Sequence, residues 1–128
     1  KALPDSENFF LGNVQGYVGM IYNTEDDSLL PLMRKISEAV LKYYPNHVES
    51  LSNISITYLL TGQHDKALPF LLKAETVRPT DVVVLNNIAQ AYKGLNKKSE
   101  ARKYYEKIIA AGTDDDKAYA KQKIKELD

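Results

Sequence analysis

The sequence contains no cysteine, which excludes disulfide bonds, thiolate zinc sites and cysteine nucleophiles. It also lacks any apolar run near the ~20 residues that a membrane-spanning helix needs. The amino terminus has no charged-then-apolar signal-peptide pattern, and the chain begins with Lys1 instead of methionine. We therefore expect a soluble protein with no membrane span. The compartment, cytoplasmic or exported, stays open because a targeting segment can be absent from this chain.

An excess of either charge is also lacking, since Lys plus Arg and Asp plus Glu both number 17 and the net charge is zero. Proteins that bind nucleic acids normally carry a basic excess that displaces counterions from phosphates. We therefore expect no nucleic-acid partner. Hydrophobic residues make up 44% and charged residues 27% of the 128 residues, which is typical of a globular chain with one core. The prediction is one domain over residues 1–128.

Signatures of catalysis are missing as well. The sequence has no phosphate-binding glycine loop, no metal-binding helix signature and no nucleophile elbow. His64 followed by Asp65 could pair a base with its orienting carboxylate, but a capping role at a helix start explains the pair with fewer assumptions. The run 114–116 lacks the spaced ligands of a calcium loop, and it is also interpreted as a helix cap. We predict a protein that is not an enzyme, with no catalytic residues, no metal and no cofactor.

What the sequence does contain is a repeat. An offset of 34 residues superposes Pro45 on Pro79, Leu51 on Leu85, Asn53 on Asn87, Ile54 on Ile88, Tyr58 on Tyr92 and Ala67 on Ala101. The apolar members of each unit are spaced i, i+3, i+7, which places them on one face of a helix. A second helix in each unit carries its own apolar face: Ala67, Leu71 and Ala74, then Ala101, Tyr105 and Ile108.

These spacings resemble the tetratricopeptide repeat family, whose unit is 34 residues long. The first unit matches at Leu51, Ile54, Ser55, Tyr58, Gly62, Ala67, Leu71, Ala74 and Pro79, with leucine for the usual tryptophan and serine for the first glycine. The second unit is looser, with Ile108 where a small residue is usual and Thr113 where proline is usual. The resemblance implies an all-α fold: a right-handed superhelical array of antiparallel helix hairpins, about three repeats plus a carboxyl-terminal capping helix.

The 34-residue frame also predicts the internal boundaries. We expect a degenerate repeat over 6–45, repeats over 46–79 and 80–113, and a capping helix over 114–128. The degenerate repeat is predicted to hold helices over 6–22 and 28–44, the second capped by Ser28 with Pro31 in its first turn. The capping helix presents a narrow apolar stripe formed by Ala120, Ile124 and Leu127.

Two local features bear on the helix ends. Gly62 can take the positive backbone angle that ends a first helix. Pro69 lies late for the first helical turn that tolerates proline, so its helix is expected to start late or to bend.

Small residues recur where helices must approach closely, at Ser55, Ala67, Ala89 and Ala101.

A basic cluster lies on the turn and second helix of the last repeat and comprises Lys97, Lys98, Arg102, Lys103 and Lys107. It can attract an acidic partner, but it is interpreted as the solvated outer face of a repeat helix. Tyr105 is predicted to lie in the core, and Tyr104 off that face.

The resemblance implies a function as well, because the first helices of such repeats line a concave groove. It places six residues there: Ser52, Asn53, Ile56, Asn86, Asn87 and Gln90. An asparagine side chain both donates and accepts, so Asn53 and Asn87 can pair with the backbone of an extended peptide whatever its sequence. We therefore expect a scaffold that binds a peptide or protein segment; the simpler interpretation of the two asparagines is exposed helix surface.

One familiar ligand of this groove is disfavoured. The carboxylate clamp for chaperone tails needs lysine, asparagine and arginine at slots that hold Val18, Tyr22, Asn53, Val83 and Asn87 here, and only Asn53 agrees. The alternative function is a structural or self-association module of a larger repeat protein. In that case copies would join through exposed apolar groups: Phe9, Phe10, Leu59 and Leu60.

Overall fold

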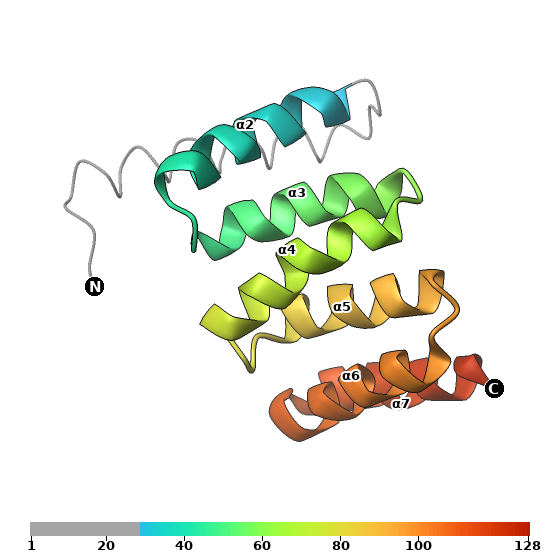
Figure 1. The fold of residues 1–128 in the computed structure, drawn as a ribbon. Helices are drawn as coiled ribbons and strands as arrows, with labels where there is room; N and C mark the ends of the chain where they lie inside the picture. The colour runs from blue at the N-terminus through green and yellow to red at the C-terminus, as the bar shows by residue number, and fades with distance from the viewer. Residues whose placement is uncertain (1–28) are drawn as a thin grey trace.

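The computed structural model describes residues 29–128, and every regular element among them is an α-helix (Figure 1). These helices are α2 (Leu30–Tyr43), α3 (Val48–Leu60), α4 (His64–Val77), α5 (Val82–Gly94), α6 (Lys98–Ala111) and α7 (Asp114–Leu127). The predicted all-α class is confirmed. The helix expected over 6–22 and the cap expected at Ser28 lie outside the described residues, and α2 has Leu29 at its N-cap with no side-chain hydrogen bond there.

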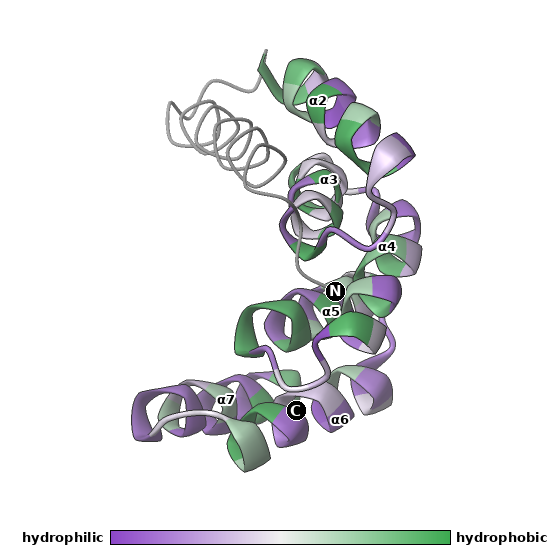
Figure 2. Cartoon of the chain, turned by 90° about the vertical axis from the view of Figure 1, so that its left-hand side faces the viewer, coloured by the Kyte–Doolittle hydropathy of each residue, from purple (hydrophilic) through white to green (hydrophobic). Residues whose placement is uncertain are grey.

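Each described helix packs on the next along the chain, and α3 also contacts α5. The helices thereby form two layers of a curved stack, with α2, α4 and α6 on one side and α3, α5 and α7 on the other (Figure 2). We call the second set the inner layer because it lies on the hollow side of the curve. The predicted array of helical hairpins is confirmed.

The core consists of the positions that the two periodic faces predict. Leu51, Ile54, Leu85 and Ile88 of the first helices are almost completely buried. The second helices bury theirs equally: Ala67, Leu71 and Ala74 on α4, then Ala101, Tyr105 and Ile108 on α6. The predicted small residues Ser55, Ala67, Ala89 and Ala101 are all 0% exposed, so the helices meet closely at these points.

A pair of aromatic rings joins the two helices of each hairpin. Tyr58 stacks on Phe70 with ring centroids 6.1 Å apart, and Tyr92 packs on Tyr104 at 5.7 Å. Both members of the second pair follow those of the first by 34 residues, so the pair is part of the repeat. Tyr104 therefore is partly buried, and its assignment away from the core face is corrected.

The turn after the first helix of each hairpin uses a left-handed residue. Gly62 has φ of 73°, as expected, and Asn96, 34 residues later, has φ of 59°. Asparagine is among the few residues that tolerate this conformation, so it substitutes for glycine in the second copy. Pro69 lies inside α4, and the expected late start is wrong because the helix begins at His64. Pro69 is exposed, so water can satisfy the carbonyl that loses its helical partner.

Helix caps account for several polar residues. Asp81 accepts hydrogen bonds from the backbone N–H groups of Val83 and Val84 at the start of α5. At α7 the predicted acidic cap is present as a capping box between Thr113 and Asp116. At α4 the N-cap residue is Gln63 with no side-chain hydrogen bond, so the capping role expected for His64 and Asp65 is wrong.

The basic cluster on α6 is only partly a solvated face. Lys97, Lys98 and Lys103 are exposed, as expected. Arg102, however, bonds Asp128 at 2.8 Å, and Lys107 bonds Glu75 of α4 at 2.8 Å. Two members of the cluster therefore link α6 to other helices instead of facing only water.

Candidate peptide-binding surface

A cavity of about 280 Å³ opens where the starts of α3 and α5 meet, and we call it the groove cavity. It is lined by Val48, Glu49, Ser52, Asn53, Ile56, Arg78, Asp81, Val83 and Val84. The two helices that contribute most of the lining belong to the inner layer (Figure 2). The cavity therefore lies on the side that the family resemblance assigns to the ligand.

The groove cavity combines an apolar lining with a charged rim. Val48 and Val84 are buried, whereas Val83 is 62% exposed at its edge. On the rim Arg78 pairs with Glu49 at 3.2 Å and with Asp81 at 3.8 Å. An apolar side chain with a polar backbone on either side fits this arrangement.

The structure brings three of the six predicted groove residues together. Ser52, Asn53 and Ile56 line the groove cavity from successive turns of α3. Ile56 also packs against the small cluster formed by Leu30 and Met33 of α2. The chemistry of this wall is therefore polar at Ser52 and Asn53 and apolar at Ile56.

The three predicted residues on α5 have separate surroundings. The Nδ2 atom of Asn87 is buried and has no hydrogen-bond partner in the part of the chain that the structure describes. The Oδ1 atom of Asn86 accepts a hydrogen bond from the Tyr119 hydroxyl of α7 at 3.0 Å. Gln90 lines a different cavity. Asn86 is thus bonded within the protein. Asn87 and Gln90 lie further along α5 and do not line the groove cavity.

Sequence reasoning missed the apolar part of the site. The sequence predicts Val83 only as a position that does not match the carboxylate clamp. It predicts no ligand contact for Val48 or Val84. The run Val82–Val84 at a helix start could have indicated this apolar site. Three consecutive helical residues point in different directions, so one buried face cannot hold all three valine side chains. One of the three, Val83, is left for the outside.

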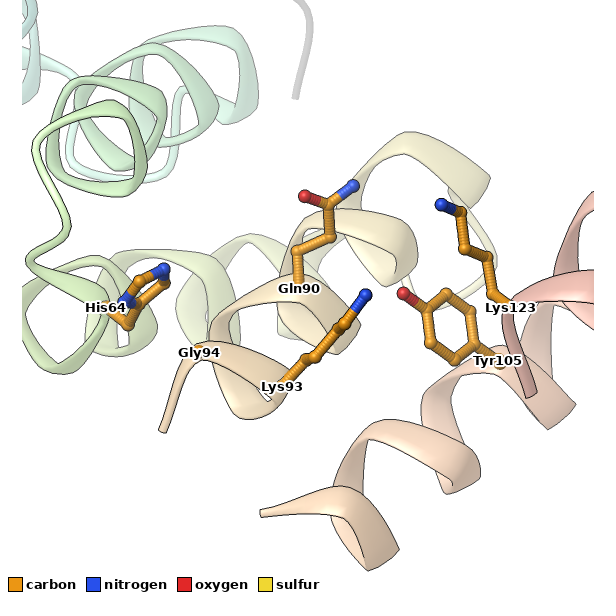
Figure 3. Close-up of a pocket in the computed structure, with 6 residues that line it drawn as sticks. All are labelled: His64, Gln90, Lys93, Gly94, Tyr105 and Lys123. Atoms are coloured by element: carbon orange, nitrogen blue, oxygen red, sulfur yellow. The ribbon is translucent and has the colours of Figure 1, made fainter. Parts of the chain in front are cut away.

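A second cavity of about 340 Å³ lies at the junction of four helices, and we call it the junction cavity (Figure 3). It is lined by His64 of α4, Gln90, Lys93 and Gly94 of α5, Tyr105 of α6 and Lys123 of α7. A Cβ at position 94 would overlap the His64 ring, so glycine there allows the ring to lie against α5. Burial, with smaller effects from Tyr119 and Glu126, raises the pKa of Tyr105 to about 12, which keeps its hydroxyl protonated at neutral pH.

Residues 29–128 show no group of three or more side chains of the metal-binding types placed to share an ion. Within the same range, no helix combines the length and apolar character needed to cross a bilayer.

Comparison with known proteins agrees with this architecture. A family model described as "Tetratricopeptide repeat" matches residues 48–81 and 82–111. No curated protein sequence matches. Among solved structures, "MamA D159K mutant 1" is 18% identical, with a TM-score of 0.57, over 79% of this chain and 69% of that one. "MamA MSR-1 C2" is 16% identical, with a TM-score of 0.58, over 79% and 68%.

At these identities the likeness to MamA establishes the fold alone. The family match covers both complete hairpins, α3–α4 and α5–α6, which contain the groove cavity and most of the junction cavity. Tetratricopeptide repeats are in general protein–protein interaction modules, and proteins built from them are typically non-enzymatic scaffolds. The chain belongs to the tetratricopeptide repeat family.

Proposed function

We propose that the inner layer binds an extended segment of a protein partner, with one apolar side chain of that segment in the groove cavity. At about 280 Å³ the cavity is slightly smaller than the ~300–1,000 Å³ range of small-molecule pockets, which suits a side chain better than a cofactor. The exposed Val83 at its edge supplies apolar surface that would lose water contact on binding.

The observation that carries this proposal is the unpaired amide of Asn87. A buried N–H without an acceptor costs about 1–3 kcal/mol, and Asn87 Nδ2 has none among the described residues. A turn of this side chain toward a ligand carbonyl would remove that cost. Val83, Asn87 and Gln90 are spaced i, i+4, i+7, so they follow one face of α5 that begins at the groove cavity.

Asn53 occupies the position of Asn87 in the preceding repeat and lines the groove cavity itself. Amides can pair with both N–H and C=O groups of an extended backbone. Two amides at equivalent places on α3 and α5 suit a ligand that lies between these two helices and follows the inner face of α5. This arrangement would confer affinity through the ligand's backbone and selectivity through the side chain in the cavity.

The test begins with peptides selected from a random 12-residue display library against the wild-type chain. We expect Asn53→Ala and Asn87→Ala each to weaken binding of the selected peptides by about 1–3 kcal/mol, or roughly 5- to 150-fold. Asn46→Ala is the matched control, because Asn46 is exposed in the turn before α3. Thermal melts of each variant show whether folding is intact.

Undiminished binding by the Asn53→Ala/Asn87→Ala double variant would move the site off the inner layer. The exposed basic surface around Lys103 would then become the next candidate. Failure to select any peptide would also contradict the proposal.

Self-association is the second candidate. Of the residues proposed for it, Leu60 is 55% exposed, whereas Leu59 packs against the core, and Phe9 and Phe10 lie outside the described residues. Further exposed apolar side chains are spread over several helices: Leu32, Tyr43, Val77, Val83 and Tyr119. Sedimentation equilibrium separates the candidates, since a constant mass of 14.4 kDa over a wide concentration range would exclude self-association.

A further inference from the structure

The junction cavity is rich in hydrogen-bond donors. Four of its lining residues have side chains that can donate: Gln90, Lys93, Tyr105 and Lys123. Figure 3 shows Gln90 and Lys93 projecting from α5, and Lys123 from α7, around the space beside the Tyr105 ring. No carboxylate is among its lining residues in the described chain. An acceptor with negative charge would complement this set.

The two lysines differ in how they are neutralised. Lys93 forms no ion pair within residues 29–128 and is exposed. Lys123 pairs with Glu126 of its own helix at 3.4 Å, and because both side chains are partly exposed this ion pair is weak. With Glu126 nearby, the two lysines leave a single net positive charge at the cavity. That balance suits a monoanionic carboxylate better than a doubly charged phosphate.

We propose that the junction cavity binds the side-chain carboxylate of an acidic residue in the segment held by the inner layer, an inference that rests on the proposed function. None of its lining residues occupies a slot of the chaperone-tail clamp, so the expected anion is a side chain within the segment instead of a terminal carboxylate. The acidic side chain would replace Glu126 as the partner of Lys123 and would give Lys93 its ion pair.

The distance between the two cavities fixes the expected spacing in the ligand. Val84 lines the groove cavity and Gln90 the junction cavity, six residues apart on α5, which is about 9 Å along the helix axis. Val83 and Lys93 are about 15 Å apart by the same measure. At ~3.3 Å per extended residue, the acidic side chain should lie about three to five residues from the apolar one. Glu49 and Asp81 on the groove rim repel an acidic residue there, which favours one orientation.

The experiment uses the selected peptides and their isosteric variants. Each Glu is replaced by Gln, and each Asp by Asn, one at a time, and the dissociation constants are measured by fluorescence anisotropy. The proteins compared are the wild type, a Lys93→Gln/Lys123→Gln variant and a Lys121→Gln/Lys125→Gln control. The control removes the same charge from exposed positions on α7 that do not line the cavity.

For the wild type we expect one acidic position, three to five residues from an apolar one, whose neutral replacement weakens binding about tenfold or more. The Lys93→Gln/Lys123→Gln variant should reduce that ratio to less than about twofold, and the control should retain it. Loss of the ratio in the control as well, or its survival in the cavity variant, would overturn the proposal.

A second measurement keeps this outcome separate from that of the proposed function. Propionate, a monoanion that matches the end of a Glu side chain, is titrated into the ¹⁵N-labelled chain at constant ionic strength, and the Gln90 side-chain amide signal is followed by NMR. A saturable shift in the wild type that disappears in the cavity variant supports the anion site even if no peptide is selected. If peptides bind through Asn87 but propionate causes no saturable shift and no acidic position matters, the anion site is wrong and the proposed function stands.

Discussion

One polar contact between the two complete hairpins can be tested by removing one hydroxyl group. The Tyr104 hydroxyl of α6 donates to Glu75 Oε1 of α4 at 2.8 Å, and Lys107 bonds Oε2 of the same carboxylate at 2.8 Å. The Glu75 side chain is only 17% exposed, and Lys107 also lies over the Tyr104 ring at 4.3 Å. Burial, followed by the hydrogen bond to Glu75, raises the pKa of Tyr104 above its usual range, so the hydroxyl remains a donor.

Tyr104→Phe should therefore lower the free energy of unfolding by about 1–2 kcal/mol. A hydrogen bond to a charged group contributes about 1.5–3 kcal/mol, and the expected loss is smaller because Lys107 and some water remain on the carboxylate. Urea denaturation measures the change, with Tyr43→Phe as control, because Tyr43 is 73% exposed and should change stability by less than about 0.5 kcal/mol. Glu75→Gln completes a double-mutant cycle.

The cycle should give a coupling energy of about 1 kcal/mol between Tyr104 and Glu75. A Tyr104→Phe effect equal to that of Tyr43→Phe, together with coupling near zero, would refute the claim that this contact helps to hold the hairpins together. The same result would leave the apolar core that α4 and α5 share, which includes Leu71 and Ile88, as the link between the hairpins.

Ala67→Leu and Ala101→Leu should each destabilise by about 1–3 kcal/mol in urea denaturation, while Lys103→Ala stays within about 0.5 kcal/mol; equal effects would show that the helix contacts are misplaced. Asn96→Ala should cost about 1 kcal/mol and Asn96→Gly almost nothing, because of the positive φ; the reverse order in thermal melts would contradict that backbone angle. Burial lowers the pKa of His47, so as the pH falls the unfolded chain takes up a proton at this residue before the folded chain does. The free energy of unfolding should therefore decrease below about pH 6.5, and decrease less in His47→Gln. Identical pH profiles of the two proteins would disprove this linkage.

The fold was largely predictable because its determinants are local and periodic. One helical face with a 34-residue repeat identifies the buried positions, including the alanines that set the helix spacing. The partial burial of Tyr104 was not predicted, because it depends on a contact with Glu75 of α4 in the other hairpin and not on the apolar face of α6. The start of α4 at His64 was not predicted, because Pro69 lies on the exposed side of the helix, where water can replace the missing backbone hydrogen bond.

The candidate site was predictable only in part. The repeat frame brought Ser52, Asn53 and Ile56 to one cavity. It did not predict the hydrogen bond that the Tyr119 hydroxyl of α7 donates to Asn86 of α5. The junction cavity takes its lining from four helices, so no spacing along the chain reveals it.

The most direct test of the central claim is an NMR titration of the ¹⁵N-labelled chain with a selected peptide. The account predicts that the largest shifts fall on the side-chain amide of Asn87 and the backbone amides near Val83, along the inner face of α5. Signals of the outer helices α4 and α6, away from the junction cavity, should change little. Shifts concentrated on exposed positions of α6 such as Lys103, with the Asn87 side-chain signal unmoved, would contradict it.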